Sequence, residues 1–361
     1  MTVFYSAHGA TKVVSRVRFE IDGRQDISSE MTELGVSRAL VLTTPEQAVQ
    51  GEELLESLGV NGVGIYSKAV MHTPVDVTQH AVAFARRLNA DCLVAIGGGS
   101  TVGLAKAIAY HTDLRQIVLP TTYAGSEATP ILGQTENGAK TTLRSERVLP
   151  EAIVYDAKLI TGLPVSMTVT SGLNAMAHAV EALYAQDANR LSRELALSGF
   201  KAFAEGLPAL VDTPSSLKLR EDTLFGAWLC GTVLGQVGMA LHHKLCHVLG
   251  GTLNLPHAQT HAIILPHATA FNEVGIPETL EPLAQLLGSQ TAGGGLFDLS
   301  KRLGAPTSLK SVGVSEDDLQ KAADAAVENP YWNPRPVTRE GIRELLQNAY
   351  EGQRPTSGST T

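Results

Sequence analysis

Short apolar runs alternate with longer amphipathic runs through residues 39–155, and this alternation constrains the fold more than any other feature of the sequence. A buried strand needs a short continuous apolar run, whereas an amphipathic helix needs apolar residues at intervals of three and four. Residues 39–43 (Ala-Leu-Val-Leu-Thr) have the first pattern, and residues 75–88 have the second. Strands that alternate with helices predict a parallel sheet covered by helices, so we expect an α/β domain.

The same two patterns recur along the first half of the chain. They predict further strands at 63–66, 92–96, 117–119 and 152–155, and further helices at 46–58 and 102–110. Residues 132–136 and 140–143 flank an Asn-Gly pair, which is typical of a β-hairpin.

The second half of the chain has a different pattern. Long Ala- and Leu-rich segments with helical periodicity follow residue 156, so this half is predicted to be helical. Glycine and proline interrupt the pattern at 156–163, where we place the domain boundary. We expect the active site in the cleft between the two domains. The predicted parts are an α/β domain at 1–156, an all-helical substrate and catalytic domain at 157–352, and a disordered, small and polar tail at 353–361.

Composition excludes several classes of protein. The chain has 361 residues, of which 43% are hydrophobic, and a formal net charge of -8. This hydrophobic content supports a large core and excludes a disordered chain. The excess of acidic residues gives no sign of a basic surface for binding a nucleic acid. No apolar run reaches the length of a membrane span, and the N-terminus lacks a secretory signal. We expect a cytoplasmic protein with no nucleic-acid or membrane partner, whose cysteines Cys92, Cys230 and Cys246 are reduced core thiols.

A glycine-rich segment, residues 97–100 (Gly-Gly-Gly-Ser), directly follows a predicted strand and opens a predicted helix. Glycines let backbone N–H groups approach a phosphate, and the helix N-terminus favours its charge. The spacing is not the Rossmann fingerprint, because Val102 stands where a third glycine is expected, and Lys106 is too far along for a P-loop. The motif alone is compatible with either a structural turn or a pyrophosphate cradle.

A second loop, residues 120–127 (Pro-Thr-Thr-Tyr-Ala-Gly-Ser-Glu), follows the next predicted strand. Both loops lie at the carboxyl edge of the sheet, where ligands bind in open α/β folds. Together they favour a nucleotide, so we predict a Rossmann-like nucleotide-binding domain. The predicted cofactor-binding residues in these loops are Gly97, Gly98, Gly99, Ser100, Thr101, Thr121, Thr122 and Ser126.

Histidines are concentrated in one part of the second half. Six of the 11 histidines lie between residues 242 and 267. Two pairs share a helical face because they are four residues apart, and His257 follows a proline. Each histidine alone is compatible with a satisfied interior residue, as for His242 and His267, but the group indicates a metal or catalytic site. The two pairs are Asn174 with His178 and His243 with His247.

These motifs together resemble the iron-containing alcohol dehydrogenase superfamily and, within it, the maleylacetate reductases. The resemblance spans about residues 35–350. The superfamily's glycine loop and Pro-Thr-Thr loop correspond to 97–100 and 120–127, and the reductase strings to 101–106, 122–127, 242–251 and 329–336.

The resemblance assigns the family's four metal-ligand positions to Asn174, His178, His243 and His257. Metal-binding members carry an aspartate at the first position, so the ligand set here is degenerate and a metal is not expected to be required. Three-His zinc sites exist, so the site is weakened rather than abolished.

Gly103 stands where alcohol-oxidising relatives have an aspartate. Thr43 follows the first strand as a further cofactor-binding residue, and with no carboxylate there to repel a 2′-phosphate we expect NADH or NADPH to be accepted.

The resemblance implies NAD(P)H-dependent reduction of the C=C bond of maleylacetate to 3-oxoadipate in aromatic-compound catabolism. The dianionic substrate needs local cations, and its developing enolate needs a proton donor or an oxyanion stabiliser. We expect His243 in that role with His247 nearby, and we expect a homodimer. Protonated histidines and Lys244 supply the charge. The predicted catalytic residues are His243, His247, His178, His257 and Lys244, and the predicted substrate contacts are Tyr123 and Asn174.

Two other functions remain open at this stage. One is a metal-dependent alcohol dehydrogenase of the same superfamily, which would bind metal and oxidise alcohols. The other is a non-catalytic nucleotide-binding protein that kept the fold, against which the retained histidines argue.

Overall fold

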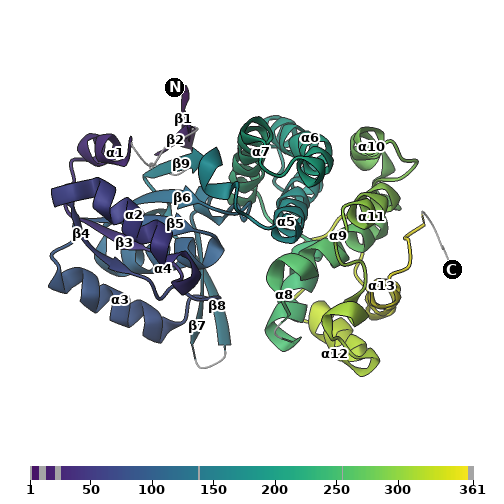
Figure 1. Cartoon of the computed structure of the whole chain (residues 1–361). Coiled ribbons are helices and arrows are strands. Elements are labelled where there is room, and N and C mark those ends of the chain that lie inside the picture. Colours follow the sequence, from purple (N-terminus) through teal and green to yellow (C-terminus); the bar gives the residue numbers. More distant parts are fainter. Residues whose placement is uncertain (1, 8–13, 21–25, 137–138, 254, 357–361) are drawn as a thin grey trace. The chain divides into compact units, whose positions relative to one another are not determined.

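The computed structural model describes residues 2–7, 14–20, 26–136, 139–253 and 255–356, and these residues form two compact units (Figure 1). The first unit comprises the chain up to Leu163 together with Ser215–Gln236. The second comprises Pro164–Pro214 together with the chain from Val237 onward. A single domain boundary near residue 156 was predicted, but the chain returns to the first unit for one helix.

The first unit is built on a sheet of seven strands in the described residues, in the order β1-β2-β9-β6-β5-β3-β4. Neighbouring strands pair in parallel except for the antiparallel pair β1 and β2. The predicted strands and the α/β class are confirmed, whereas β1 and β2 were not predicted. The strands are β1 Thr2–Ala7, β2 Val14–Glu20, β3 Ala39–Leu42, β4 Gly62–Tyr66, β5 Cys92–Gly97, β6 Arg115–Pro120 and β9 Ala152–Asp156.

Helices cover both faces of this sheet because alternate strand residues point to opposite sides. Leu40 and Leu42 of β3 pack with helices α3 (Val75–Arg87) and α4 (Gly99–Thr112). Ala39 and Val41 pack on the other face, with α1 (Ile27–Leu34) and α2 (Ala48–Leu58). Strands buried on both faces explain the continuous apolar runs of the sequence.

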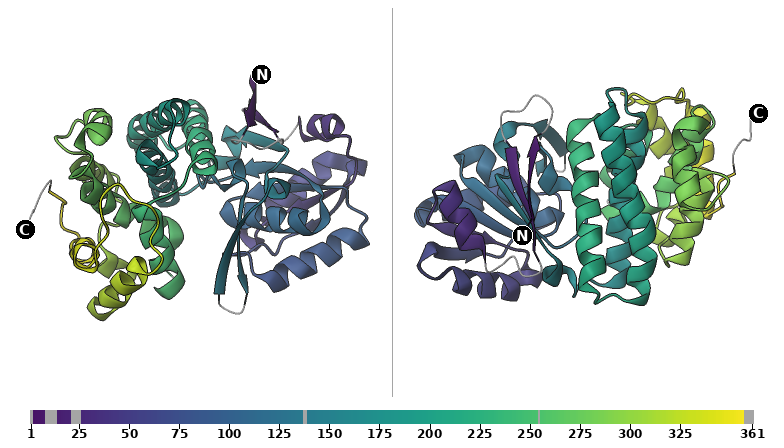
Figure 2. Two further views of the ribbon diagram at one scale, coloured as in Figure 1. Left: turned by 180° about the vertical axis from the view of Figure 1, so that it is seen from behind. Right: turned by 90° about the horizontal axis from the view of Figure 1, so that it is seen from above.

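A two-stranded hairpin, β7 (Ile131–Glu136) and β8 (Ala139–Arg144), projects from the first unit (Figure 2). The predicted hairpin is confirmed, although its Asn-Gly turn lies outside the described residues. Short 3-10 turns connect the elements of the chain. They are η2 Pro45–Gln47, η3 Gly59–Asn61, η4 Ser126–Ala128, η5 Glu146–Val148, η6 Ala157–Ile160 and η7 Leu309–Val312.

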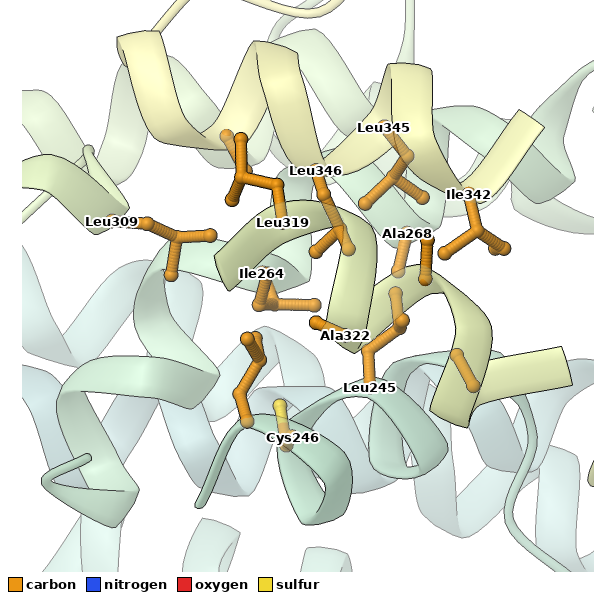
Figure 3. Packing of buried hydrophobic residues seen from close by; sticks show 14 of the residues in the cluster. Leu245, Cys246, Ile264, Ala268, Leu309, Leu319, Ala322, Ile342, Leu345 and Leu346 are labelled. Carbon is orange, nitrogen blue, oxygen red and sulfur yellow. The ribbon is translucent and has the colours of Figure 1, made fainter. Parts of the chain in front are cut away.

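The described part of the second unit is helical, as predicted. Helix α5 (Val165–Tyr184) is buried at every position from Thr168 to its end and contacts both α6 and α9. Helices α8, α9, α12 and α13 enclose a separate apolar cluster, in which Leu245, Ile264, Leu319 and Leu346 meet (Figure 3). Besides α5, the helices of this unit are α6 Arg190–Asp212, α8 Leu241–Leu253, α9 His257–Glu273, α10 Pro277–Leu286, α11 Ala292–Arg302, α12 Glu316–Val327 and α13 Arg339–Glu351.

The segment after α13 is held in place as far as the structure describes it. Arg354 pairs with Asp298 of α11 at 2.8 Å, and the Gln353 N–H donates to the Asn348 carbonyl at 3.0 Å. The predicted disordered tail began at residue 353, so its first residues are ordered by these contacts. Residues 357–361 lie outside the described residues.

Helix α7 (Leu217–Gln236) is the segment that returns to the first unit. Its Phe225 and Trp228 rings lie 5.5 and 5.8 Å from the Phe19 ring of β2. A Cβ at Gly231 would lie 2.7 Å from the Gly125 carbonyl oxygen, so glycine lets the helix touch the backbone of the loop after β6. Among the described residues no single helix is long and apolar enough to cross a membrane, although α7 and α8 taken together pass on length and composition alone.

This close approach predicts the effect of Gly231→Ala. The new methyl group must displace the loop that includes Thr121, Thr122 and Ser126, because its neighbours are backbone atoms of Gly125. We expect weaker binding of the expected nicotinamide cofactor, by about tenfold or more, and a destabilisation of about 1–3 kcal/mol. Fluorescence titration with NADH and thermal melting measure the two effects. Gly162→Ala is the control, because its Cβ would meet no atom within 4 Å.

Candidate functional site

The predicted site residues fall into two groups, one in each compact unit. The first group follows strands β3, β5 and β6. Strand β4 lies on one side of β3 and β5 on the other, so the chain changes direction across the sheet between β3 and β5. Ligands of doubly wound sheets bind outside the carboxyl ends of the strands at such a switch point. Thr43 and Gly97 stand at the ends of these two strands.

The glycine loop is packed too tightly to carry side chains. A Cβ at Gly97 would clash with Thr101 Oγ1, and one at Gly98 would lie 3.0 Å from Thr122 Cγ2. Helix α4 begins directly afterwards, at Gly99. The backbone N–H groups at its first turn therefore form a natural anion-binding site without interference from side chains.

Gln47 joins the loops after β3, β5 and β6, and the sequence analysis missed it. Its Nε2 donates to Thr121 Oγ1 at 3.0 Å, while its Oε1 lies 3.0 Å from the place of a Gly97 Cβ. The helix predicted at 46–58 begins only at Ala48, and Gln47 lies in the 3-10 turn before it. The polar run Thr-Thr-Pro-Glu-Gln directly after a strand was the signal available.

Three of the predicted ligand-contact residues are completely buried. Thr43 and Thr101 are 0% exposed, with hydroxyl groups that have no partner among the described residues. Tyr123 is also 0% exposed, and its hydroxyl bonds Thr223 at 2.8 Å and Arg220 at 3.3 Å within the first unit. This burial argues against the substrate contact predicted for Tyr123, because the side chain fastens the β6 loop to α7 instead.

Lys106 of α4 supports the same loop from inside. Its Nζ donates to the carbonyl oxygens of Ser126, Thr129 and Ile131. Burial is the main cause that lowers the Lys106 pKa to about 7. These hydrogen bonds to carbonyl oxygens fix the position of Ser126, so Lys106 has a structural role here.

The second group of predicted residues lies in the second unit, on three helices. Helix α5 carries Asn174 and His178, α8 carries His243, Lys244 and His247, and α9 begins at His257. The His178 and His243 rings stack with centroids 5.2 Å apart, and the His243 and His247 rings lie 6.2 Å apart. The structure therefore brings the predicted histidines of α5 and α8 together.

Glu181 holds His243, and the sequence analysis missed this residue. Its carboxylate is 0% exposed and accepts hydrogen bonds from the backbone N–H groups of Ala240 at 2.8 Å and His242 at 2.6 Å. His243 Nδ1 lies 2.7 Å from Glu181 Oε2, while His243 Nε2 is buried without a partner among the described residues. A carboxylate at Nδ1 fixes the ring and leaves Nε2 for chemistry. The signal available was an acidic residue in the apolar run Ala-Val-Glu-Ala-Leu, three residues after His178.

His178 differs from its predicted role as a cation. Burial, followed by the neighbouring His243 and His257, holds its pKa well below the ordinary histidine value. His178 is therefore neutral near pH 7 and supplies no positive charge to an anionic substrate. Its place beside His243 is confirmed by the ring contact, but the charge must come from other residues.

Lys244 and His247 lie toward the surface, next to the segment that follows α12. Lys244 Nζ donates to the Glu328 carbonyl at 2.9 Å and lies 5.8 Å from the Tyr331 ring centroid. The Tyr331 hydroxyl lies 3.0 Å from His247 Nδ1. Tyr331 is a further site residue that the sequence analysis did not assign a role, although it lies in the string 329–336.

A compact cluster lies beside these residues in the interior. His242 Nε2 and His261 Nδ1 are 2.9 Å apart, and Cys246 Sγ is 3.6 Å from His242 Nε2. In the part of the chain that the structure describes, these are the only three His, Cys or acidic residues whose ligand atoms all lie within 4.8 Å of one another. Burial raises the Cys246 pKa well above its usual value, so a hydrogen-bonded core cluster accounts for the contacts.

Comparisons with known proteins agree over nearly the full length of the chain. The family models described as "Iron-containing alcohol dehydrogenase" and "Fe-containing alcohol dehydrogenase family, C-terminal" match residues 15–157 and 168–350. A maleylacetate reductase of Rhizobium sp. (strain MTP-10005) is 56% identical over 96% of this chain and 98% of its own length. The chain belongs to the iron-containing alcohol dehydrogenase family.

Other relatives lead to the same family. A maleylacetate reductase of Burkholderia cepacia is 50% identical over 95% of this chain and 97% of its own length. The crystal structure of maleylacetate reductase from Agrobacterium tumefaciens has a TM-score of 0.93 at 55% identity and covers 98% of this chain and 100% of that one. This member of the iron-containing alcohol dehydrogenase family is an NAD(P)-dependent oxidoreductase, and the predicted nucleotide cofactor is confirmed at that level.

The family name raises the question of whether this chain's residues fit iron. Asn174 Oδ1 and His243 Nε2 are buried without a partner among the described residues, which suits a ligand of some kind. The inferred ligand set contains no carboxylate, and its atoms do not form one compact group in the described structure. An amide and three imidazoles hold a divalent iron ion more weakly than a set that includes an aspartate.

The bond between Glu181 and His243 predicts the effect of Glu181→Gln. The neutral amide can still accept from His243 Nδ1–H but no longer stabilises the imidazolium, so we expect kcat to fall about 10²-fold, while the dissociation constant of NADH stays the same. Stopped-flow kinetics and NADH titration measure the two quantities, and thermal melting checks the fold.

A double-variant cycle separates positioning from general damage. In a His243→Ala background, Glu181→Gln should have little further effect on kcat, because the residue that it orients is absent. The pH profile of kcat should also shift in Glu181→Gln. Additive losses in the double variant and an unshifted profile would contradict the positioning role.

Proposed function

We propose that this chain is a maleylacetate reductase, which uses NADH or NADPH to reduce the C=C bond of maleylacetate to 3-oxoadipate in the catabolism of aromatic compounds. Relatives with that name match the chain over nearly its full length. The observation that carries the proposal is the buried His243–Glu181 pair, together with the neutral Asn174 on the same helix as Glu181. His243, held by a carboxylate, can transfer a proton. A metal-dependent alcohol dehydrogenase would instead need an aspartate at the position of Asn174 to complete its metal-ligand set.

The chemistry requires one donor of hydride and one of a proton. The nicotinamide cofactor supplies the hydride to an alkene carbon when it is bound. Charge then builds on the conjugated carbonyl oxygen of the substrate, which is the oxygen of an enolate. His243 in its protonated form donates from Nε2, while Glu181 accepts from Nδ1–H and stabilises the imidazolium. Proton transfer from His243 thus takes the place of a Lewis acid.

The substrate carries two carboxylates in a protein with a net charge of -8, so local cations must hold it. Lys244 is half-buried beside His243 and keeps N–H donors beyond its bond to Glu328. His247 and His257 are exposed to solvent, unlike the buried His178. The neutral Asn174 is buried near His178, where an aspartate would repel an anionic substrate.

Acceptance of both NADH and NADPH is proposed from the residues after β3. Thr43 and Thr44 follow that strand, where a carboxylate would exclude a 2′-phosphate. We also propose a homodimer. Strand β1 is an edge strand of the sheet in the described residues, and an unpaired edge favours association with a second copy.

Gly98→Val tests the cofactor loop. Its Cβ would already lie 3.0 Å from Thr122 Cγ2, and the two methyl groups would cover the backbone N–H groups at the start of α4. We expect NADH binding to weaken by about 10²-fold, as measured by fluorescence titration. The thermal midpoint should fall, because Thr122 must shift to admit the side chain, while the protein stays folded at the assay temperature. Gly250→Val is the matched control, since its Cβ meets nothing within 4 Å. Normal NADH binding by a folded Gly98→Val protein would show that the loop is not the cradle.

Removal of metal tests the reaction itself. We expect NADH-dependent reduction of maleylacetate, followed at the NADH absorbance, to survive exhaustive chelation, because the donor set lacks a carboxylate. Asn174→Asp should raise metal affinity and raise KM for maleylacetate through like-charge repulsion. Stoichiometric iron or zinc whose removal abolishes reduction would contradict the metal-free reaction. Alcohol oxidation without maleylacetate reduction would instead support the alcohol dehydrogenase alternative.

A further inference from the structure

A second cavity lies in the second unit, away from the histidine site. Its volume is about 340 Å³, and its walls come from the C-terminal half of α9, from α13, from Arg335 and from residues 353–356. It shares no lining residue with the predicted catalytic set. His267 of its wall stands ten residues after His257 on α9, which corresponds to about 15 Å along a helix. The volume lies at the small end of the range for small-molecule sites.

Arg335 gives this cavity an unpaired positive charge. Its side chain is half-buried, its Nη1 donates to the Phe271 carbonyl at 2.9 Å, and its guanidinium carbon lies 4.1 Å from the Phe271 ring centroid. No acid pairs with it among the described residues. Arg354, also in the wall, is already paired with Asp298. A partly desolvated guanidinium whose partners are a carbonyl and a ring retains N–H donors for a carboxylate.

The rest of the wall is mixed in character. Asn348 and Gln353 offer amide groups, and His267 Nε2 is buried without a partner among the described residues. Ala270, Phe271, Val274, Leu345 and Pro355 form the apolar part. The exposed carboxylate of Glu344 also borders the cavity and disfavours a second negative group. The walls therefore select one carboxylate on a small apolar body.

We propose that this cavity is a second ligand site, which binds a small monocarboxylate with an apolar body through Arg335. The proposal goes beyond the proposed reductase activity and does not depend on it. The ligand is monoanionic, in contrast to the dianion expected at the histidine site. Its carboxylate accepts from Arg335, and its body packs on Phe271 and Leu345.

The segment that carries Arg335 also reaches the histidine site. Tyr331 bonds His247 at 3.0 Å, and Asn333 exchanges hydrogen bonds with Asn272 of α9 at 2.9 and 2.7 Å. Occupation of the cavity therefore acts on a segment that has contacts at both places. Trp332 follows Tyr331 directly in this segment, is 41% exposed, and is one of only two tryptophans in the chain.

Trp332 permits a direct test with benzoate as the probe and benzamide as its neutral counterpart. In a Trp228→Phe background, Trp332 is the only tryptophan. We expect a saturable change of its fluorescence with benzoate and at least tenfold weaker binding of benzamide, since only the carboxylate pairs with Arg335. Calorimetry with the unmodified protein gives an independent dissociation constant. Neither measurement needs cofactor or substrate, so failure here is separate from failure of the reductase proposal.

Variants locate the probe. Arg335→Gln and Asn348→Asp should each weaken benzoate binding by about tenfold or more, the second by adding a negative charge to the wall without a change of shape. Gln186→Glu is the control, because it adds the same charge at an exposed residue that does not line the cavity. Lys244→Ala should leave binding unchanged. The proposal would be overturned if benzamide bound as tightly as benzoate, or if Asn348→Asp left benzoate binding unchanged. Loss of benzoate binding in Lys244→Ala would also overturn it, because benzoate would then bind at the histidine site.

Discussion

The buried carboxylate of Glu181 is the interaction on which the site depends. It lies on α5 and accepts from the backbone of Ala240 and His242 and from the ring of His243, so one group fixes both the start of α8 and the direction of its principal histidine. A buried charge is costly unless donors surround it, and here three donors do so. Asn174 stands where the resemblance places an aspartate in metal-binding relatives. An amide at this position is compatible with the arrangement, because the acid that bonds His243 is Glu181, elsewhere on α5.

Close approach of backbones is the corresponding constraint in the first unit. Gly97 and Gly98 leave no room for side chains beside Thr101 and Thr122, and Gly231 lets α7 touch the loop at Gly125. Buried groups such as Tyr123 and Lys106 then fix that loop from behind. The surface proposed to bind the cofactor thus consists mainly of backbone, and the hydroxyl-bearing residues around it contribute partly as packing.

The segment from residue 328 to 338 connects different parts of the second unit. It contacts α8 through Lys244 and His247, and α9 through Asn272 and Phe271. Such a segment has few apolar anchors of its own, since Tyr331 and Trp332 are partly exposed. The ligand proposed at Arg335 would therefore bind to a segment that also contacts His247.

The sequence by itself determined the α/β class, the strands from β3 onward, the helical second half and the pairing of His243 with His247 on one face, because these follow from local periodicity and from spacing along one helix. The contact of His178 with His243 joins two helices and was decided by the tertiary structure. Nor did the sequence determine β1 and β2, the return of α7 to the first unit, or the roles of Gln47, Glu181 and Tyr331. Those depend on partners distant in the sequence: Glu181 is 62 residues from His243, and Tyr331 is 84 from His247. Burial likewise decided that Tyr123 packs and that His178 is neutral, since solvent exposure and neighbouring charge exist only in the folded chain.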